Sequence, residues 1–155
     1  KYFEKNIKKL KYNLILHFSS REEVGLGSFN SITTKDIDNI IVIDTGIASD
    51  TPVIPQDVKN SVYMGKGTII SRNIDDNISF GNELIKLANK HKIRYQREFF
   101  NGNGSTNNMH YAKFNNSFSQ CIGPPVRNIH SPIEVIHKDD IVSTFKLVQE
   151  FLSSN

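Results

Sequence analysis

N-I-I-V-I-D, residues 39–44, is the stretch that decides the fold class of this chain. Its four consecutive β-branched residues between Asn39 and Asp44 are typical of a strand that is buried on both faces within an α/β sheet. A similar run, N-L-I-L-H-F at residues 13–18, predicts a second strand of this kind. The glycines of R-E-E-V-G-L-G, residues 21–27, predict a turn after that strand. In open α/β sheets, ligands bind beyond the carboxyl ends of the strands.

Helical and extended patterns alternate along the rest of the chain. Apolar residues recur at helical spacing in residues 79–92 and 140–152, and residues 2–11 form an amphipathic helical pattern. Further predicted elements are a glycine-interrupted strand at 62–71, a strand at 94–100, a short helix at 107–114 and an apolar stretch at 118–123. This alternation predicts a three-layer α/β fold.

The composition restricts the possible classes of function. At 155 residues the chain has the size of one domain, and 37% hydrophobic with 23% charged residues is typical of a soluble globular protein. The net charge of +3 is small, and the densest lysines lie on the polar face of the predicted helix 2–11, so we expect no nucleic-acid partner. No segment reaches the roughly 18 apolar residues of a membrane helix. The single cysteine, Cys121, excludes an internal disulfide and favours a cytoplasmic location.

Glu22 and Glu23 form a carboxylate pair just after the predicted strand 13–18. Adjacent acids are most often a solvated surface pair. In an extended segment, however, neighbouring side chains point in opposite directions, so one carboxylate can bind a metal while the other faces a substrate as a general base. The residue pattern alone leaves both interpretations open.

Asp44 and His130 are the other candidates for chemistry. Asp44 ends the apolar strand, where an acid either caps the following turn or supplies an oxygen ligand. His130 lies in a loop between prolines, where a histidine is more often a hydrogen-bonded structural residue than a ligand. Because zinc sites combine histidine with carboxylates, the two residues together with Glu22 and Glu23 form a possible donor set.

Four segments, in order, resemble the signature blocks of the tetrahedral (TET), glutamyl-aminopeptidase-like family of two-metal aminopeptidases. R-E-E-V-G-L at 21–26 resembles the block Q-E-E-V-G-L, and I-V-I-D-T at 41–45, continuing to Pro52, resembles the segment with a metal-binding aspartate. G-K-G at 65–67 resembles the start of G-K-G-P, and P-V-R-N-I-H-S-P-I-E at 125–134 resembles P-x-R-Y-x-H-S-P-x-E.

The resemblance implies that residues 1–155 are the C-terminal part of a single α/β/α metallopeptidase catalytic domain of the phosphorylase/hydrolase-like type. It implies Glu22 as the general base, Glu23 and His130 as ligands of one divalent ion, and Asp44 as a ligand of the other, with zinc or cobalt as the ions. The implied function is removal of N-terminal residues from peptides by a water that the two ions activate. It also implies a homo-oligomer, and a further histidine and aspartate in an N-terminal half, which a separate chain could supply.

Three positions depart from the family pattern. The usual G-G-T-D-A block reads G-S-T-N-N at 104–108, Asn128 replaces a typical tyrosine and Thr68 a typical proline. An amide in place of an acid near the site favours a second hypothesis, a non-catalytic remnant or interaction module that keeps the peptidase fold. A third hypothesis keeps the metal-dependent hydrolysis and changes the substrate to another amide. Metal content and peptidase assays distinguish the catalytic from the non-catalytic hypothesis.

Overall fold

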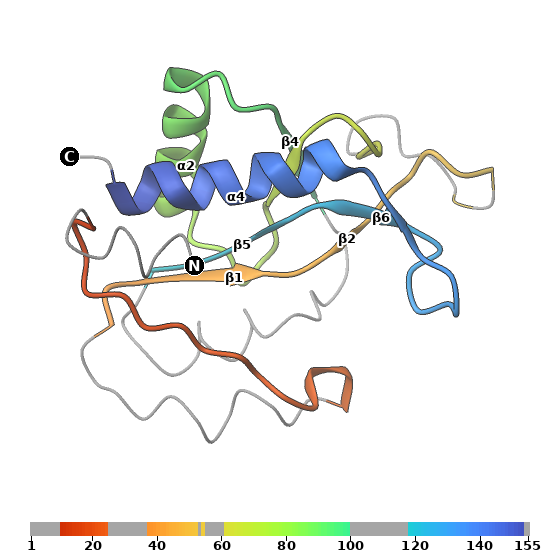
Figure 1. Cartoon of the computed structure of the whole chain (residues 1–155), viewed down its shortest axis with the longest axis horizontal. Coiled ribbons are helices and arrows are strands. Elements are labelled where there is room, and N and C mark those ends of the chain that lie inside the picture. The colour runs from red at the N-terminus through yellow and green to blue at the C-terminus, as the bar shows by residue number, and fades with distance from the viewer. Residues whose placement is uncertain (1–9, 25–36, 53, 55–60, 100–117, 154–155) are drawn as a thin grey trace.

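The computed structural model describes residues 10–24, 37–52, 54, 61–99 and 118–153, which form two sheets and two long helices (Figure 1). The main sheet contains β1 (Asn39–Ile43), β5 (Phe118–Gly123), β3 (Thr68–Ser71) and β4 (Tyr95–Glu98), in that spatial order. β1 runs parallel to β5, and β3 runs parallel to β4. β3 is antiparallel to β5, so the sheet is mixed.

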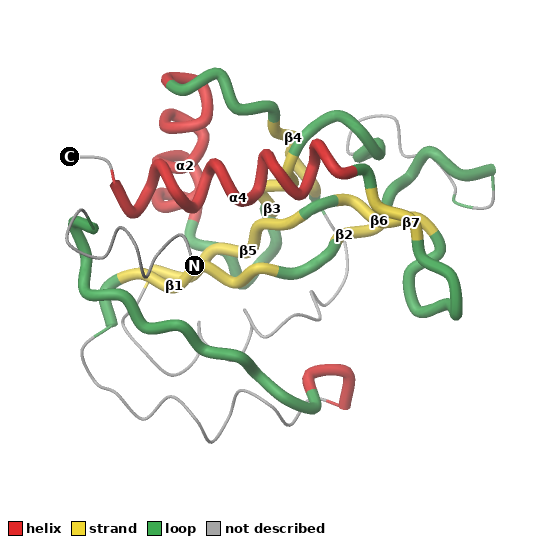
Figure 2. The backbone as a smooth tube through the Cα atoms, viewed as in Figure 1, coloured by secondary structure: helices red, strands yellow, loops and turns green. Residues whose placement is uncertain are grey.

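The second sheet continues from the first. It consists of β2 (Gly46–Ile47), β6 (Pro125–Arg127) and β7 (Val135–Ile136), with β2 parallel to β6 (Figure 2). The amides of Asp44 and Gly46 donate to the carbonyls of Ile122 and Pro124, so hydrogen bonding does not stop between the sheets. The pairs β1–β2 and β5–β6 therefore form one long parallel ribbon.

The helices α2 (Ile78–Lys90) and α4 (Lys138–Ser153) cover the same face of the main sheet (Figure 1). Their apolar stripes meet alternate residues of β3 and β5 because successive strand side chains point to opposite faces. The buried core consists of Ile70, Phe80, Leu84, Ala88, Ile93, Ile122, Leu147, Phe151 and Leu152. Each large apolar side chain buried in this way contributes about 1.5–3 kcal/mol.

Most of the predicted elements are confirmed. β1 and β5 occupy the predicted stretches 39–44 and 118–123, β4 lies within 94–100, and α2 and α4 match the two predicted long helices within two residues at each end. The α/β class is therefore confirmed. In the described part of the chain, no helix is long and apolar enough to cross a membrane. Most of the predicted helix 2–11 and all of the helix 107–114 lie outside the described residues.

The predicted strand 62–71 is shorter than expected. Only residues 68–71 form β3, and residues 64–66 make a turn. Gly65 and Gly67 have φ angles of 83° and 110°, which interrupt the extended backbone.

The predicted strand at residues 13–18 is wrong. The segment forms no strand, and the side chains of Ile15, Leu16 and Phe18 are exposed. It is anchored just before this stretch, where the Tyr12 ring stacks on Phe151 at a centroid distance of 5.1 Å. An apolar run becomes a strand only when a neighbouring strand supplies the hydrogen-bond ladder, and here the contacts to the core come from side chains instead.

Candidate metal-binding site

The four candidate residues lie at the junction between the two sheets. Asp44 follows β1, at the point where the ribbon passes into the second sheet, and His130 lies in the loop between β6 and β7. Glu22 and Glu23 lie in a short 3₁₀ turn, Glu22–Val24. Segments far apart in the sequence therefore bring three carboxylates and one imidazole together. The charges of these groups shift the pKa values of Glu22 and Asp44.

The local backbone places Asp44 by a close approach of two strands. A Cβ atom on Gly123 would overlap the carbonyl oxygen of Asp44, so only glycine allows β5 to pass at this distance. The Asp44 Oδ1 atom accepts a hydrogen bond from the amide of Thr45 at 2.7 Å. This hydrogen bond holds one carboxylate oxygen of Asp44 against the backbone between β1 and β2.

His130 stands on a tight loop with an uncommon backbone conformation. Asn128 and His130 have φ angles of 58° and 60°, in the left-handed region that few residues other than glycine adopt. The His130 amide donates to Glu134 Oε1 at 2.7 Å, and the Ser131 amide donates to the Asn128 carbonyl at 3.1 Å. These hydrogen bonds hold the loop in a shape that directs the imidazole towards Glu23.

Glu23 and His130 make the one direct contact among the four residues. Glu23 Oε2 and His130 Nε2 are 3.3 Å apart, and both side chains are largely exposed. Two ligand atoms about 2.0–2.1 Å from a tetrahedral zinc ion are separated by about 3.4 Å, so this spacing fits two ligands of one ion. The same spacing also fits a simple ion pair if the histidine is protonated.

The pKa values of Glu22 and Asp44 record the crowding of negative charge. Burial raises the pKa of Glu22, the charges of Asp44 and Glu23 raise it further, and His130 lowers it. Burial also raises the pKa of Asp44, the Thr45 amide lowers it, Glu23 raises it and His130 lowers it. Each carboxylate is thus within electrostatic reach of the others, an arrangement that a bound cation would relieve.

The donor set in the described residues fits part of a two-metal site. Carboxylate oxygen and imidazole nitrogen are the donors that zinc and similar ions take. Within the described ranges, however, no group of three or more His, Cys, Asp or Glu side chains is close enough to hold an ion. The arrangement brings together two groups of ligand type, Glu23 and His130, with the carboxylate of Asp44 in electrostatic reach.

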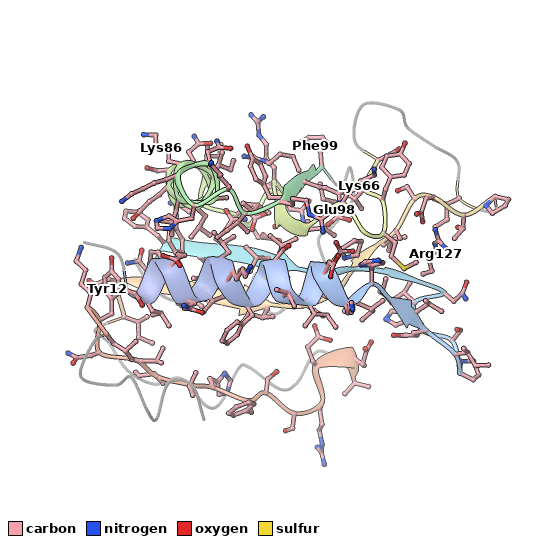
Figure 3. The ribbon with its side chains drawn as sticks, turned by 45° about the horizontal axis from the view of Figure 1, so that its top comes forward. Tyr12, Lys66, Lys86, Glu98, Phe99 and Arg127 are labelled. Atoms are coloured by element: carbon pink, nitrogen blue, oxygen red, sulfur yellow. The ribbon has the colours of Figure 1, made fainter. Side chains whose placement is uncertain are left out.

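Sequence reasoning missed a half-buried carboxyl group next to β2. Glu98, at the end of β4, lies against β2 and accepts a hydrogen bond from the amide of Ile47 (Figure 3). Burial and the nearby Asp76 raise its pKa from 4.5 to about 7. The sequence did not mark Glu98 as it marked Asp44, because Glu98 lies two residues before the end of the predicted strand 94–100.

Polar contacts also fix the turn before β3. The buried carboxylate of Asp140 accepts hydrogen bonds from the amides of Gly65 and Gly67 at 2.6 and 2.7 Å. The Gln96 side chain donates a hydrogen bond to the Gly67 carbonyl at 3.2 Å. Because β3 is antiparallel to β5, this turn lies at the end of the sheet where β5 leads into β6. The sequence marked residues 65–67 by resemblance alone and did not predict Asp140 as their anchor.

Comparison with known structures places the chain in the class of TET-type aminopeptidase folds. A TET aminopeptidase from the marine sediment archaeon Thaumarchaeota archaeon SCGC AB-539-E09 matches with a TM-score of 0.77 and 26% identity, over 88% of this chain and 39% of that chain. An aminopeptidase from the archaeon Desulfurococcus kamchatkensis matches with a TM-score of 0.77 and 27% identity, over 88% and 40%.

The chain belongs to the M42 glutamyl aminopeptidase family, whose sequence profile it matches over residues 2–147. A curated relative, described as "Putative aminopeptidase" of Acetivibrio thermocellus, is 31% identical over 152 residues. That match covers 94% of this chain and 44% of the relative. The chain therefore spans about two fifths of the length of the relatives that it matches.

Proposed function

We propose that this chain is part of a metal-dependent aminopeptidase that removes N-terminal residues from peptides. Glu23 and His130 would bind one divalent ion, Asp44 would bind a second, and Glu22 would act as the general base. The observation that carries the proposal is the 3.3 Å contact between Glu23 and His130, in a cluster that also includes Glu22 and Asp44. The rest of the protein would complete both ligand sets.

The chemistry follows from the environment of each group. Two bound ions, zinc or cobalt, would polarise the scissile carbonyl and lower the pKa of the attacking water. A general base works best when its pKa lies near the working pH, and burial together with Asp44 moves the pKa of Glu22 upward in that direction. Glu22 would take a proton from the water and hold it for the leaving amine.

Reconstitution of the whole protein tests this proposal. The chain alone should not hydrolyse aminoacyl amides or short peptides, because Glu23 and His130 would give one ion only two ligands and Asp44 would give the other only one. Addition of an N-terminal half that supplies the remaining histidine and aspartate should restore activity with zinc or cobalt. Robust turnover by the 155-residue chain alone, or a reconstituted protein with no activity on any peptide, would refute it.

A non-catalytic module remains the second candidate. The described residues lack a three-ligand cluster, which is the observation in its favour. The reconstituted protein would then bind no metal and turn over no peptide, whereas the proposed enzyme does both. A homo-oligomeric state, a separate N-terminal chain and a cytoplasmic location stay predictions.

A further inference from the structure

A bidentate ion pair joins the two chain segments that carry Asp44 and His130. Arg127 Nε donates to Asp50 Oδ1 at 2.9 Å, and Arg127 Nη2 donates to Asp50 Oδ2 at 2.7 Å. Asp50 follows Asp44 on the same segment, and Arg127 ends β6 just before the His130 loop. Figure 3 labels Arg127. Two parallel hydrogen bonds of this kind fix orientation as well as distance, because both groups are planar.

Asp50 also holds a third segment. Its Oδ2 atom accepts the amide of Met64 at 3.2 Å, at the start of the turn before β3. The side chain of Asp50 is only 16% exposed, so the pair is shielded on the aspartate side. The hydrogen bonds from Arg127 lower the pKa of Asp50 and keep it ionised at neutral pH. One carboxylate thus ties together three loops at the end of the sheet where the candidate site lies.

The pairing of β2 with β6 contributes few backbone hydrogen bonds next to the His130 loop. β2 and β6 share a short register, Gly46 with Pro125 and Ile47 with Val126, and Pro125 has no amide hydrogen to donate. The last hydrogen bond of the ribbon runs from the Ala48 amide to the Val126 carbonyl. The Arg127–Asp50 pair comes directly after it, before the left-handed residues Asn128 and His130. Among the described residues, this pair is the side-chain contact that ties the base of that loop to the Asp44 segment.

We propose that Arg127 and Asp50 are positioning residues, which fix the His130 loop against the Asp44 segment and so set the spacing of the two proposed metal positions. Neither residue belongs to the proposed ligand set, because the Asp50 carboxylate is taken up by Arg127 and by the Met64 amide. The inference rests on the proposed function only for the identity of His130 and Asp44 as ligands. The rigidity of the loop is a separate property that can be measured without metal.

The test compares the full chain with Arg127→Lys and Asp50→Asn. Lysine keeps the positive charge of Arg127 but cannot donate two parallel hydrogen bonds. Asparagine keeps the shape of Asp50 but loses the negative charge and one acceptor oxygen. Arg94→Lys is the matched control, because Arg94 also pairs with an aspartate, Asp139 at 3.3 Å, which belongs to α4 and not to the segment that carries Asp44. Amide hydrogen exchange measures loop rigidity, and cobalt titration followed by NMR measures weak metal binding at Glu23 and His130.

Both variants at the pair should speed exchange of the amides at 128–131 and weaken cobalt binding by about tenfold, the usual effect of losing a group that orients a ligand. Amides of α2 and α4 should keep their wild-type rates, and Arg94→Lys should change neither measurement. Unchanged exchange at 128–131 in both variants, or faster exchange spread evenly over the helices, would overturn the positioning role. A failure of the proposed function gives a different result. If His130 is not a ligand, His130→Ala leaves cobalt binding unchanged, and the exchange rates at 128–131 still decide whether the pair positions the loop.

Discussion

At the scale of single residues, position along a strand explains both what could be predicted and what could not. Asp44 ends the predicted strand 39–44, whereas Glu98 ends β4 only in the structure, because the predicted strand continued to residue 100. The two carboxyl groups also differ in the neighbour that covers them. Glu98 is half-buried because β2, from a different sheet, lies against it, and that contact depends on the path of the chain rather than on the residues around Glu98.

Glu98 should make the stability of the protein depend on pH. Its pKa in the folded protein, about 7, lies above its ordinary value of 4.5. The folded state therefore holds the proton more tightly, and this contribution is fully present below pH 4.5 and lost as the pH rises through 7. At about 1.4 kcal/mol per pH unit, the loss is up to about 3 kcal/mol.

Urea unfolding of Glu98→Gln at pH 5 and pH 8 measures this effect. The neutral amide should make the variant more stable than the wild type at pH 8 and remove most of the difference between the two pH values. Glu83→Gln, which changes an exposed acid on α2, is the control. Equal pH dependence in Glu98→Gln and the wild type would contradict the raised pKa.

Glu22 and Glu23 should respond differently to the same substitution in the reconstituted protein. Glu22→Gln removes a general base while keeping its shape, so turnover should fall by about 10²–10⁴-fold with metal binding retained. Glu23→Gln removes a ligand, so metal affinity should fall first. Measurement of turnover and cobalt content for both variants separates the roles. Loss of metal in Glu22→Gln, with retention in Glu23→Gln, would reverse the assignment.

At the scale of elements, periodicity predicted the long helices and the paired strands well, because their burial repeats along the segment. The stretches 39–44 and 13–18 look alike in sequence, yet only the first forms a strand. β1 has β5 beside it, whereas residues 13–18 form no ladder. An apolar run alone therefore does not decide whether a segment becomes a strand, because the strand also needs a neighbour that supplies the ladder.

The turn before β3 should tolerate alanine at one glycine and not at the other. Both Gly65 and Gly67 have positive φ angles, and this conformation costs an alanine about 1–2 kcal/mol. At Gly67 a Cβ atom would also collide with the backbone of Arg94, whereas at Gly65 it would meet only the ring of His137 at ordinary contact distance. Thermal unfolding should therefore show Gly67→Ala to be less stable than Gly65→Ala, by about 1–3 kcal/mol. Equal unfolding midpoints would show that β3 shifts to make room.

At the scale of the whole molecule, the ordered set of short motifs predicted the family, and the contacts that assemble the site could not be predicted. Motifs record which residues are present, whereas the Arg127–Asp50 pair and the Glu23–His130 contact depend on two sheets that share one ribbon. The boundary of the domain at residues 1–155 stays a prediction, since the chain spans 39–44% of the length of the relatives that it matches.

Metal binding by the chain alone should reflect its partial donor set. Catalytic zinc sites usually have three protein ligands. The described residues offer Glu23 and His130 for one ion and Asp44 for another, with mutual repulsion among the acids. Calorimetry with zinc or cobalt should therefore show weak binding and no stoichiometry of two tight ions. His130→Ala should abolish what binding there is, because it removes one of two ligands, whereas His91→Ala, which changes a histidine paired with Glu150 between the helices, should leave it unchanged. Two tightly held ions on the wild-type chain would show that residues outside the described part complete both ligand sets.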